Sequence, residues 1–200
     1  MVLRTGAEAT LRLNDDLAPE LLLSAYAQGV FPMDCDGEVC WFRPLRRAIL
    51  PVGGFRASRS LKRSAKRYEI TFDKGYTDVI RACADREETW ISEEFVRAYT
   101  GLFERGFGHS CEAWVGEQLV GGVYGVALCG AFMAESMFHR ATDAGKVALW
   151  RLVERLESSG YALIDVQYIT PHLEALGAIE ISRREYEERL AEALKLLPRW

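Results

Sequence analysis

The chain has 200 residues, 49% of them hydrophobic, and a net charge of −4 at pH 7. This apolar content excludes a disordered chain, and no run approaches the roughly 18 apolar residues of a membrane-spanning helix. Five cysteines without a Cys-x-x-Cys pair, and a start without an apolar signal region, predict free thiols, a cytoplasmic protein and no metal site.

Glycines and prolines interrupt residues 17–60 repeatedly, which predicts a small N-terminal unit of short strands. A helix capped by Ser58 or Ser60 is expected over residues 58–67. From residue 69 the apolar periodicity is regular. It predicts a strand at 69–72, helices at 76–84 and 92–105, strands at 110–115, 118–127 and 131–138, a long helix at 143–158, a strand at 161–168, a helix at 172–176, a strand at 179–181 and a final helix from 182. An antiparallel meander followed by helix, strand and helix indicates an α+β fold.

A basic block lies between Glu38 and Glu69, although the chain as a whole is acidic. It has no acidic residue and nine basic ones, namely Arg43, Arg46, Arg47, Arg56, Arg59, Lys62, Arg63, Lys66 and Arg67. A solvated helix face is the simpler interpretation of such a run. Nine cations without a compensating acid favour a surface that binds phosphate groups.

Three polar residues lie in strands that are otherwise apolar. Asp165 and Gln167 are two residues apart and are expected on one face of their strand. They form either a structural network or a pair in which Asp165 fixes Gln167, whose amide oxygen then accepts a hydrogen bond from a reacting amine. Glu135 lies between Met133 and Met137, so its carboxylate is either at the solvent edge or buried with a partner.

Several common sites are not predicted. The histidines are in three separate segments, no nucleophile elbow is present, and Gly145-Lys146 lacks the remaining residues of a phosphate-binding P-loop. Asp143 would repel an anion at the start of the long helix, which disfavours a coenzyme A site. We therefore expect no cofactor.

Ordered sequence blocks identify a family that this chain resembles. They are YAQGVFPM at 26–33, WFRPLRRAIL at 41–50, SRSLKR at 58–63, DREETWI at 85–91, HS-E-W and LVGGVYG within 106–125, ESMF at 135–138, KVAL at 146–149, IDVQ at 164–167 and HL-x-x-LGA at 172–178. Over about residues 17–190 the chain resembles the bacterial leucyl/phenylalanyl-tRNA–protein transferases.

The resemblance implies a fold and an activity. The fold is a small N-terminal domain, expected at residues 1–60, and a GCN5-related N-acyltransferase-like domain at 61–200 with a mixed, mainly antiparallel sheet flanked by helices. The activity is transfer of an amino acid from aminoacyl-tRNA to the N-terminal Arg or Lys of a protein, which marks that protein for degradation. The implied partners are charged tRNA and the acceptor protein, with no membrane, and the implied state is a monomer.

The resemblance also implies roles for individual residues. Gln167, held by Asp165, assists the attacking amine, and Glu135 binds the acceptor end or the amino group of the donor. The terminal adenosine of tRNA is expected near Trp41, Phe42 and Trp90, although core packing is the alternative for Trp90. The donor side chain is expected among Val123, Phe132, Ala134, Leu152, Leu156 and Ile164. The tRNA backbone is expected at Arg56, Arg59, Lys62, Arg63, Lys66 and Arg67.

Four positions depart from the family pattern around the donor side chain. Leu152 and Leu156 replace phenylalanines, Val123 replaces a methionine, and Ala134 replaces a glycine. The pocket for the donor side chain is therefore expected to be wider at its floor and slightly narrower at its mouth. We therefore predict that phenylalanine and methionine are transferred at least as well as leucine.

Two other functions remain open from the sequence. One is an aminoacyl-tRNA-dependent ligase that acts on a cell-wall precursor or a small amine. The other is a tRNA-binding module without catalysis, which the Asp165 and Gln167 pair disfavours because binding alone needs no polar pair inside a strand.

Overall fold

The computed structural model describes residues 17–200. The first sixteen residues of the predicted N-terminal unit lie outside the described part. The elements are, in chain order, α1 (Pro19–Ala27), β1 (Phe31–Cys35), β2 (Glu38–Phe42), β3 (Arg46–Leu50), α2 (Arg59–Ala65), β4 (Glu69–Phe72), α3 (Tyr76–Ala84), α4 (Glu93–Glu104), β5 (Gly108–Val115), β6 (Gln118–Leu128), β7 (Ala131–His139), α5 (Ala144–Ser159), β8 (Leu163–Gln167), α6 (Pro171–Ala175), β9 (Ile179–Ser182) and α7 (Arg183–Ala193).

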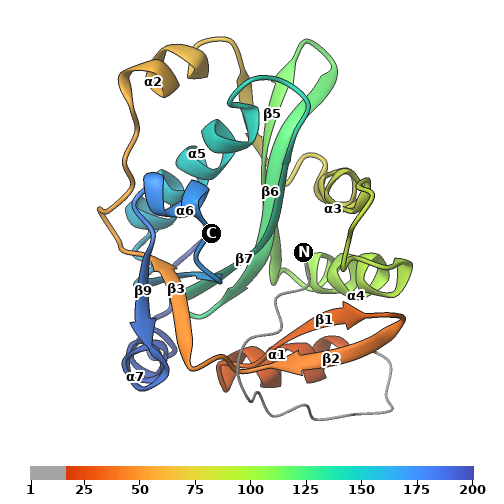
Figure 1. Cartoon of the computed structure of the whole chain (residues 1–200), viewed down its shortest axis with the longest axis vertical. Coiled ribbons are helices and arrows are strands. Elements are labelled where there is room, and N and C mark those ends of the chain that lie inside the picture. The colour runs from red at the N-terminus through yellow and green to blue at the C-terminus, as the bar shows by residue number, and fades with distance from the viewer. Residues whose placement is uncertain (1–16) are drawn as a thin grey trace.

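A seven-stranded sheet organises the molecule, with the strand order β4-β5-β6-β7-β8-β3-β9 (Figure 1). Among the described strands, β7 and β8 run parallel and the other pairings are antiparallel. The strands β1 and β2 form a separate hairpin. The predicted α+β class, with a mixed and mainly antiparallel sheet flanked by helices, is confirmed.

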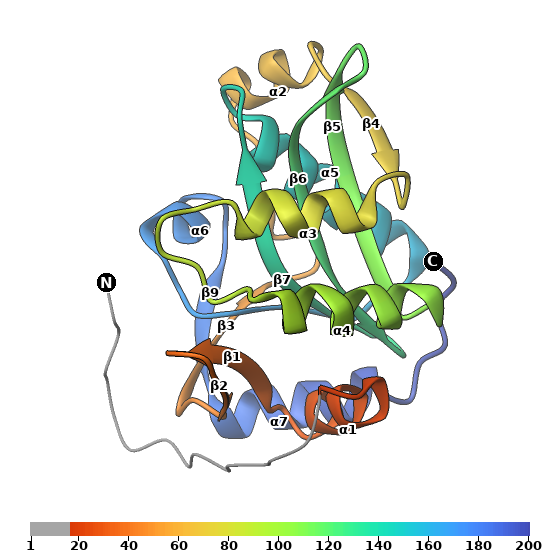
Figure 2. The same ribbon diagram turned by 90° about the vertical axis from the view of Figure 1, so that its right-hand side faces the viewer.

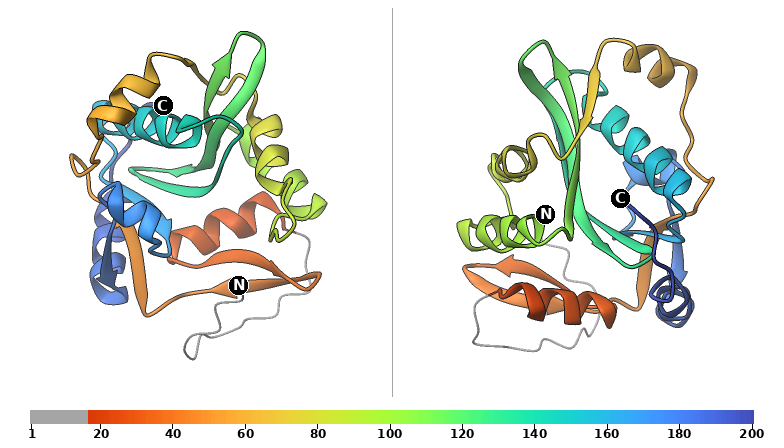
Figure 3. Two further views of the ribbon diagram at one scale, coloured as in Figure 1. Left: turned by 45° about the horizontal axis from the view of Figure 1, so that its top comes forward. Right: turned by 180° about the vertical axis from the view of Figure 1, so that it is seen from behind.

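Helices cover both faces of the sheet. The helices α3 and α4 pack on one face, and α5 packs on the other with α2 beside it (Figure 2; Figure 3). Successive residues of β6 therefore enter different cores: Val123 belongs to the apolar cluster under α5, and Tyr124 to the cluster under α3 and α4. No helix among residues 17–200 has the length and apolar character of a membrane span.

Two β-bulges interrupt the middle of the sheet. Tyr124 pairs with Ser136 and Gly125 pairs with Ala134, so Glu135 is an extra residue on β7. On the neighbouring strand, Gln167 pairs with Ala48 and Asp165 with Ile49, so Val166 is extra on β8. The parallel pairing of β7 with β8 reaches Met133 and Asp165. Both bulges thus come directly after the last residue pair between β7 and β8. Bulges change the direction in which side chains point, and they are common next to functional sites.

The N-terminal region contains one element that the sequence pattern does not predict. Its predicted short strands are present as β1, β2 and β3. The helix α1 is not predicted from the sequence for two reasons. Its own residues are mostly apolar and show no clear polar face, and its N-cap residue, Ala18, makes no side-chain hydrogen bond. The strand β3 lies inside the seven-stranded sheet, between β8 and β9. The division of the chain at residue 60 stays a prediction.

Candidate active site

A buried ion pair lies next to the candidate site and holds part of its backbone in place. Arg47 of β3 donates to both carboxylate oxygens of Asp165 on β8, from Nε at 2.8 Å and from Nη2 at 2.5 Å. Arg47 is 1% exposed and Asp165 is 0% exposed. The Tyr186 hydroxyl also donates to Asp165 (2.8 Å), and the guanidinium lies between the rings of Phe31 and Tyr186. A buried pair with this many partners holds its groups in a fixed geometry.

Asp165 contacts Gln167 through the backbone, whereas the sequence interpretation expects a contact that fixes the amide. The backbone N–H of Gln167 donates to Asp165 Oδ1 at 2.9 Å. Gln167 has a φ of +57°, a left-handed conformation that is strained for a residue with a side chain. Asp165 therefore stabilises an unusual backbone turn that directs the Gln167 side chain.

Glu135 is the direct partner of the Gln167 side chain. Gln167 Nε2 donates to Glu135 Oε1 at 3.1 Å, and the Tyr99 hydroxyl donates to Glu135 Oε2 at 3.0 Å. The Tyr26 hydroxyl lies 2.6 Å from that of Tyr99. Because only the NH₂ group of an amide donates, the amide oxygen of Gln167 faces away from the carboxylate and is available to another donor.

The environment of Glu135 makes its charge sensitive to pH near neutrality. Of the two positions that the sequence leaves open, the structure shows the partly buried carboxylate with partners. Burial raises the pKa of Glu135 to about 7, against the lowering effect of the hydroxyls of Tyr26 and Tyr99, and the negative charge of Asp165 raises it further. A carboxyl with such a pKa changes its protonation state near neutral pH, a property that is common among groups at functional sites.

A cavity of about 310 Å³ opens beside Glu135 and Gln167. Trp90 is one of its walls, together with Phe31 and Met33 from β1. The ring of Phe42 stacks on that of Phe31, with centroids 5.9 Å apart. Trp41 is placed elsewhere: it is 3% exposed and lines a different cavity with Arg43 and Glu187. The structure thus places Trp90 beside the hydrogen-bonded side chains of Glu135 and Gln167, which we call the acid–amide pair. Phe42 lies behind Phe31.

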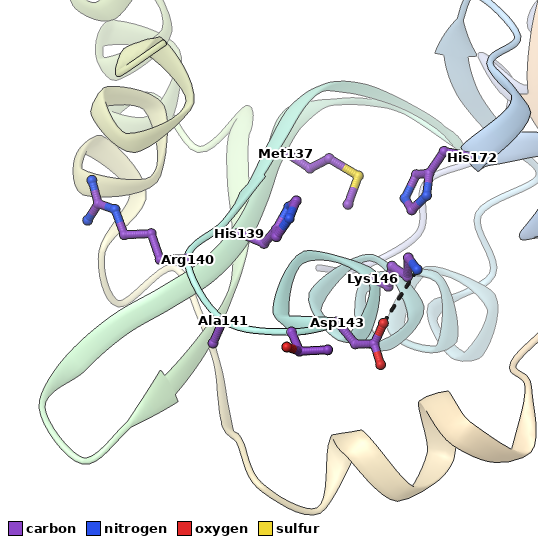
Figure 4. A pocket seen from close by; sticks show the side chains of 8 residues that line it. Met137, His139, Arg140, Ala141, Asp143, Lys146 and His172 are labelled. Atoms are coloured by element: carbon purple, nitrogen blue, oxygen red, sulfur yellow. Dashed lines mark ion pairs between the residues drawn. The ribbon is translucent and has the colours of Figure 1, made fainter.

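A second cavity has a volume of about 650 Å³, and Figure 4 shows residues that line it. Met137 and His172 line both, and they face one another across the second cavity. At its far side Lys146 lies 3.4 Å from Asp143, which also accepts a hydrogen bond from Ser64 of α2 (2.8 Å). The two cavities thus share Met137 and His172, and Asp143 at the edge of the second contacts α2 through Ser64.

Sequence reasoning assigns no site role to several residues that line or support these cavities. Tyr26 and Met137 lie in the blocks YAQGVFPM and ESMF, but their residue types do not separate them from core residues, and Tyr99 lies in none of the blocks. His172 is one of three histidines in separate segments of the sequence, for which no site is predicted, yet it lines both cavities. Burial and the nearby positive charge of Lys146 lower the pKa of His172, which favours the neutral imidazole.

The predicted donor-pocket residues lie together in the apolar cluster under α5. They are Val123, Phe132, Ala134, Leu152, Leu156 and Ile164, each between 0% and 9% exposed. Ala134 directly precedes Glu135, so the chain itself connects this cluster to the acid–amide pair.

The basic block divides into two groups in the structure. Arg43 and Arg46 pair with Glu187 and Glu180, and Arg47 is buried against Asp165. The expectation that all nine cations form one phosphate-binding surface is therefore corrected for these three, because acidic residues distant in sequence neutralise them. The other six, Arg56, Arg59, Lys62, Arg63, Lys66 and Arg67, are exposed on and around α2.

The fold and the site together define an α+β protein whose acid–amide pair, beside a cavity, suits transfer of an acyl group to an amine. The sequence profile of the family described as leucyl/phenylalanyl-tRNA protein transferase matches residues 49–191, and that of its N-terminal domain matches residues 15–45. The chain belongs to this family, and the predicted enzyme class, an aminoacyltransferase, is confirmed.

Individual relatives carry the same name. The leucyl/phenylalanyl-tRNA–protein transferase of Herpetosiphon aurantiacus is 50% identical over 90% of this chain and 95% of its own length. That of Rubrobacter xylanophilus is 53% identical, over 90% and 96%, and that of a Ruegeria species is 55% identical, over 89% and 87%.

Solved structures give more distant likenesses. L-PGS from Bacillus licheniformis aligns with a TM-score of 0.43 and 12% identity, over 73% of this chain and 56% of that one. A GCN5-related N-acetyltransferase-like protein from Streptococcus suis aligns with a TM-score of 0.37 and 14% identity, over 80% and 65%.

Proposed function

We propose that this protein transfers leucine, phenylalanine and methionine from aminoacyl-tRNA to the N-terminal Arg or Lys of acceptor proteins, and so creates a degradation signal. The names of the relatives support leucine, phenylalanine, tRNA and a protein acceptor. The observation that supports the chemistry most directly is the Gln167–Glu135 hydrogen bond beside the cavity.

The reaction makes a limited demand on the site. The acceptor α-amine attacks the ester carbonyl, a C–N bond forms, and the C–O bond to the tRNA ribose breaks. One proton leaves the amine and one is gained by the ribose oxygen. The ester is already activated, so catalysis consists of positioning and of hydrogen bonds that strengthen as charge develops.

The residues around the cavity fit separate parts of this task. The Gln167 amide oxygen faces away from Glu135 and accepts a hydrogen bond from the attacking amine. Glu135, when ionised, binds the positive amino group of the donor or the acceptor end. Asp165 and Arg47 fix the backbone turn that carries Gln167, so we assign them a positioning role.

The tRNA is proposed to bind along α2 and to reach the site through the two cavities. The six exposed cations bind backbone phosphates without reading sequence. The 3′ end then passes Lys146 and His172, and its terminal base stacks near Trp90 and the Phe31–Phe42 pair. Stacking on an aromatic ring contributes about 1–3 kcal/mol per base.

A direct transfer assay tests the proposal. The protein is mixed with leucyl-tRNA and a reporter peptide that begins with Arg, and product mass is measured. Matched reporters that begin with Lys, Ala or acetylated Arg test the acceptor rule, and a free small amine tests the alternative ligase. We expect product with Arg and Lys and none with acetylated Arg, because that peptide has no free α-amine. Product with the free amine alone would contradict the proposal.

A further inference from the structure

The segment after α7 brings Trp200 to the face of the sheet that holds the proposed donor pocket. It passes the β6–β7 turn, where the Gly130 N–H donates to the Ala193 carbonyl at 2.9 Å. Leu194 packs with the cluster on the α3 and α4 side, whereas Trp200 packs with the cluster under α5. The C-terminal end of the described chain accordingly lies beside α5 (Figure 2).

The Trp200 indole is fixed by several different contacts. Its Nε1 donates to Asp73 at 2.6 Å. Its ring stacks on the His109 ring, with centroids 3.9 Å apart, and the Arg155 guanidinium lies 4.8 Å from its centroid. These contacts leave the indole little freedom to turn.

Trp200 also packs beside the ring of Phe132. The two rings are almost parallel, at 14°, with centroids 5.9 Å apart. Phe132 is 0% exposed, and the edge of its ring approaches Gly125, where a Cβ would lie 2.5 Å from Phe132 Cε1. Tyr161 bounds another side, at 6.5 Å and 80°. The indole of Trp200 is therefore one of the groups that confine the Phe132 ring, together with Gly125 and Tyr161.

We propose that Trp200 is a positioning residue for donor choice: it supports the Phe132 ring and thereby sets the depth of the donor side-chain pocket. This inference rests on the proposed function and on the expectation, given by the family resemblance, that Phe132 contacts the donor side chain. Trp200 lies outside residues 49–191, to which the family profile extends. Without the indole, the Phe132 ring turns into the vacated space, the pocket deepens, and larger donor side chains gain relative to leucine.

The test is a competition among leucyl-, phenylalanyl- and tryptophanyl-tRNA for one Arg-terminated peptide. We expect Trp200→Ala to raise the kcat/KM of tryptophan and phenylalanine relative to leucine by about tenfold. Trp200→Phe removes the hydrogen bond to Asp73 but keeps a ring behind Phe132, so it should retain the natural ratio. Leu197→Ala is the matched control, because Leu197 belongs to the same segment and is 88% exposed.

The measured ratio does not depend on the fraction of folded enzyme, because all donors compete for the same molecules. A purely structural role would lower all donors equally and leave the ratio unchanged, which would overturn the inference while transfer itself persists. The same shift in Leu197→Ala would also overturn it. A natural protein that transfers none of these amino acids would contradict the proposed function, and the inference with it.

Discussion

At the scale of single residues, Glu135 links protonation to stability. Its pKa is raised from 4.5 to about 7, chiefly by burial, so the folded protein binds more protons than the unfolded chain between these pH values. The free energy of unfolding should therefore fall as pH rises from about 4.5 to about 7. We expect Glu135→Gln to reduce this fall, measured by urea unfolding at pH 5 and pH 8. Glu104→Gln, at an exposed position of α4, is the control and should unfold with the wild-type pH dependence.

Variants of Gln167 and Asp165 should have similar effects on kcat but different effects on the free energy of unfolding. Gln167→Ala should lower kcat by about 10²-fold, the scale of a positioned proton acceptor, with little loss of stability. Asp165→Ala should also lower kcat, and should cost about 3–5 kcal/mol of stability because it leaves Arg47 buried without its anion. Single-turnover kinetics and urea unfolding measure the two effects. Near-normal turnover in folded Gln167→Ala would contradict the assigned role.

At the scale of elements, α2 is expected to bind the backbone of tRNA. Replacing Lys62, Arg63, Lys66 and Arg67 by Glu should raise the KM for charged tRNA and reduce its salt dependence. In a plot of the logarithm of tRNA affinity against the logarithm of salt concentration, the slope should decrease in magnitude by about one unit for each phosphate that the variant no longer neutralises. The control replaces Arg97 of α4 and Arg184 of α7, which are exposed on other elements. An unchanged KM and slope in the α2 variant would place the tRNA elsewhere.

The helix α5 provides the test of donor choice. Leu152 and Leu156 are one turn apart, both 0% exposed, and face the same apolar cluster. Leu152→Phe should narrow the proposed pocket and shift preference from phenylalanine and methionine towards leucine. Competition among leucyl-, phenylalanyl-, methionyl- and valyl-tRNA measures this as ratios of kcat/KM. A natural preference for leucine that Leu152→Phe leaves unchanged would remove these positions from the pocket.

The regular elements could be predicted from the sequence because their apolar periods are long. The helix α5 and the strands β5 to β7 lie within two residues of their expected bounds. The bulge at Glu135 could not be predicted, because strict alternation places this residue beside Met133 and nothing local marks the extra residue. The contact between Arg47 and Asp165 could not be predicted either, because the two residues are 118 positions apart and nothing in the sequence distinguishes Arg47 from the other cations of its block.

At the scale of the whole molecule, the support of the site is assembled from distant parts of the chain. Arg47 of β3 binds Asp165 of β8, donates to the carbonyl of Gly29 after α1, and packs against Tyr186 of α7. The strand β3 also pairs with both β8 and β9. The N-terminal segment therefore supplies a strand of the seven-stranded sheet and the counter-charge of the buried Asp165, so its folding should be coupled to that of the rest.

This coupling predicts a single cooperative unfolding transition for residues 17–200, although the sequence suggests a separate unit before residue 60. Two single-tryptophan variants report on the parts: one keeps Trp41, which is 3% exposed in the N-terminal segment, and the other keeps Trp150 of α5. Their urea transitions should coincide with each other and with far-UV circular dichroism. Arg47→Met should move all midpoints down together, because Asp165 loses its counter-charge at a cost of about 3–5 kcal/mol. An earlier transition at Trp41 alone would show that the N-terminal unit folds independently.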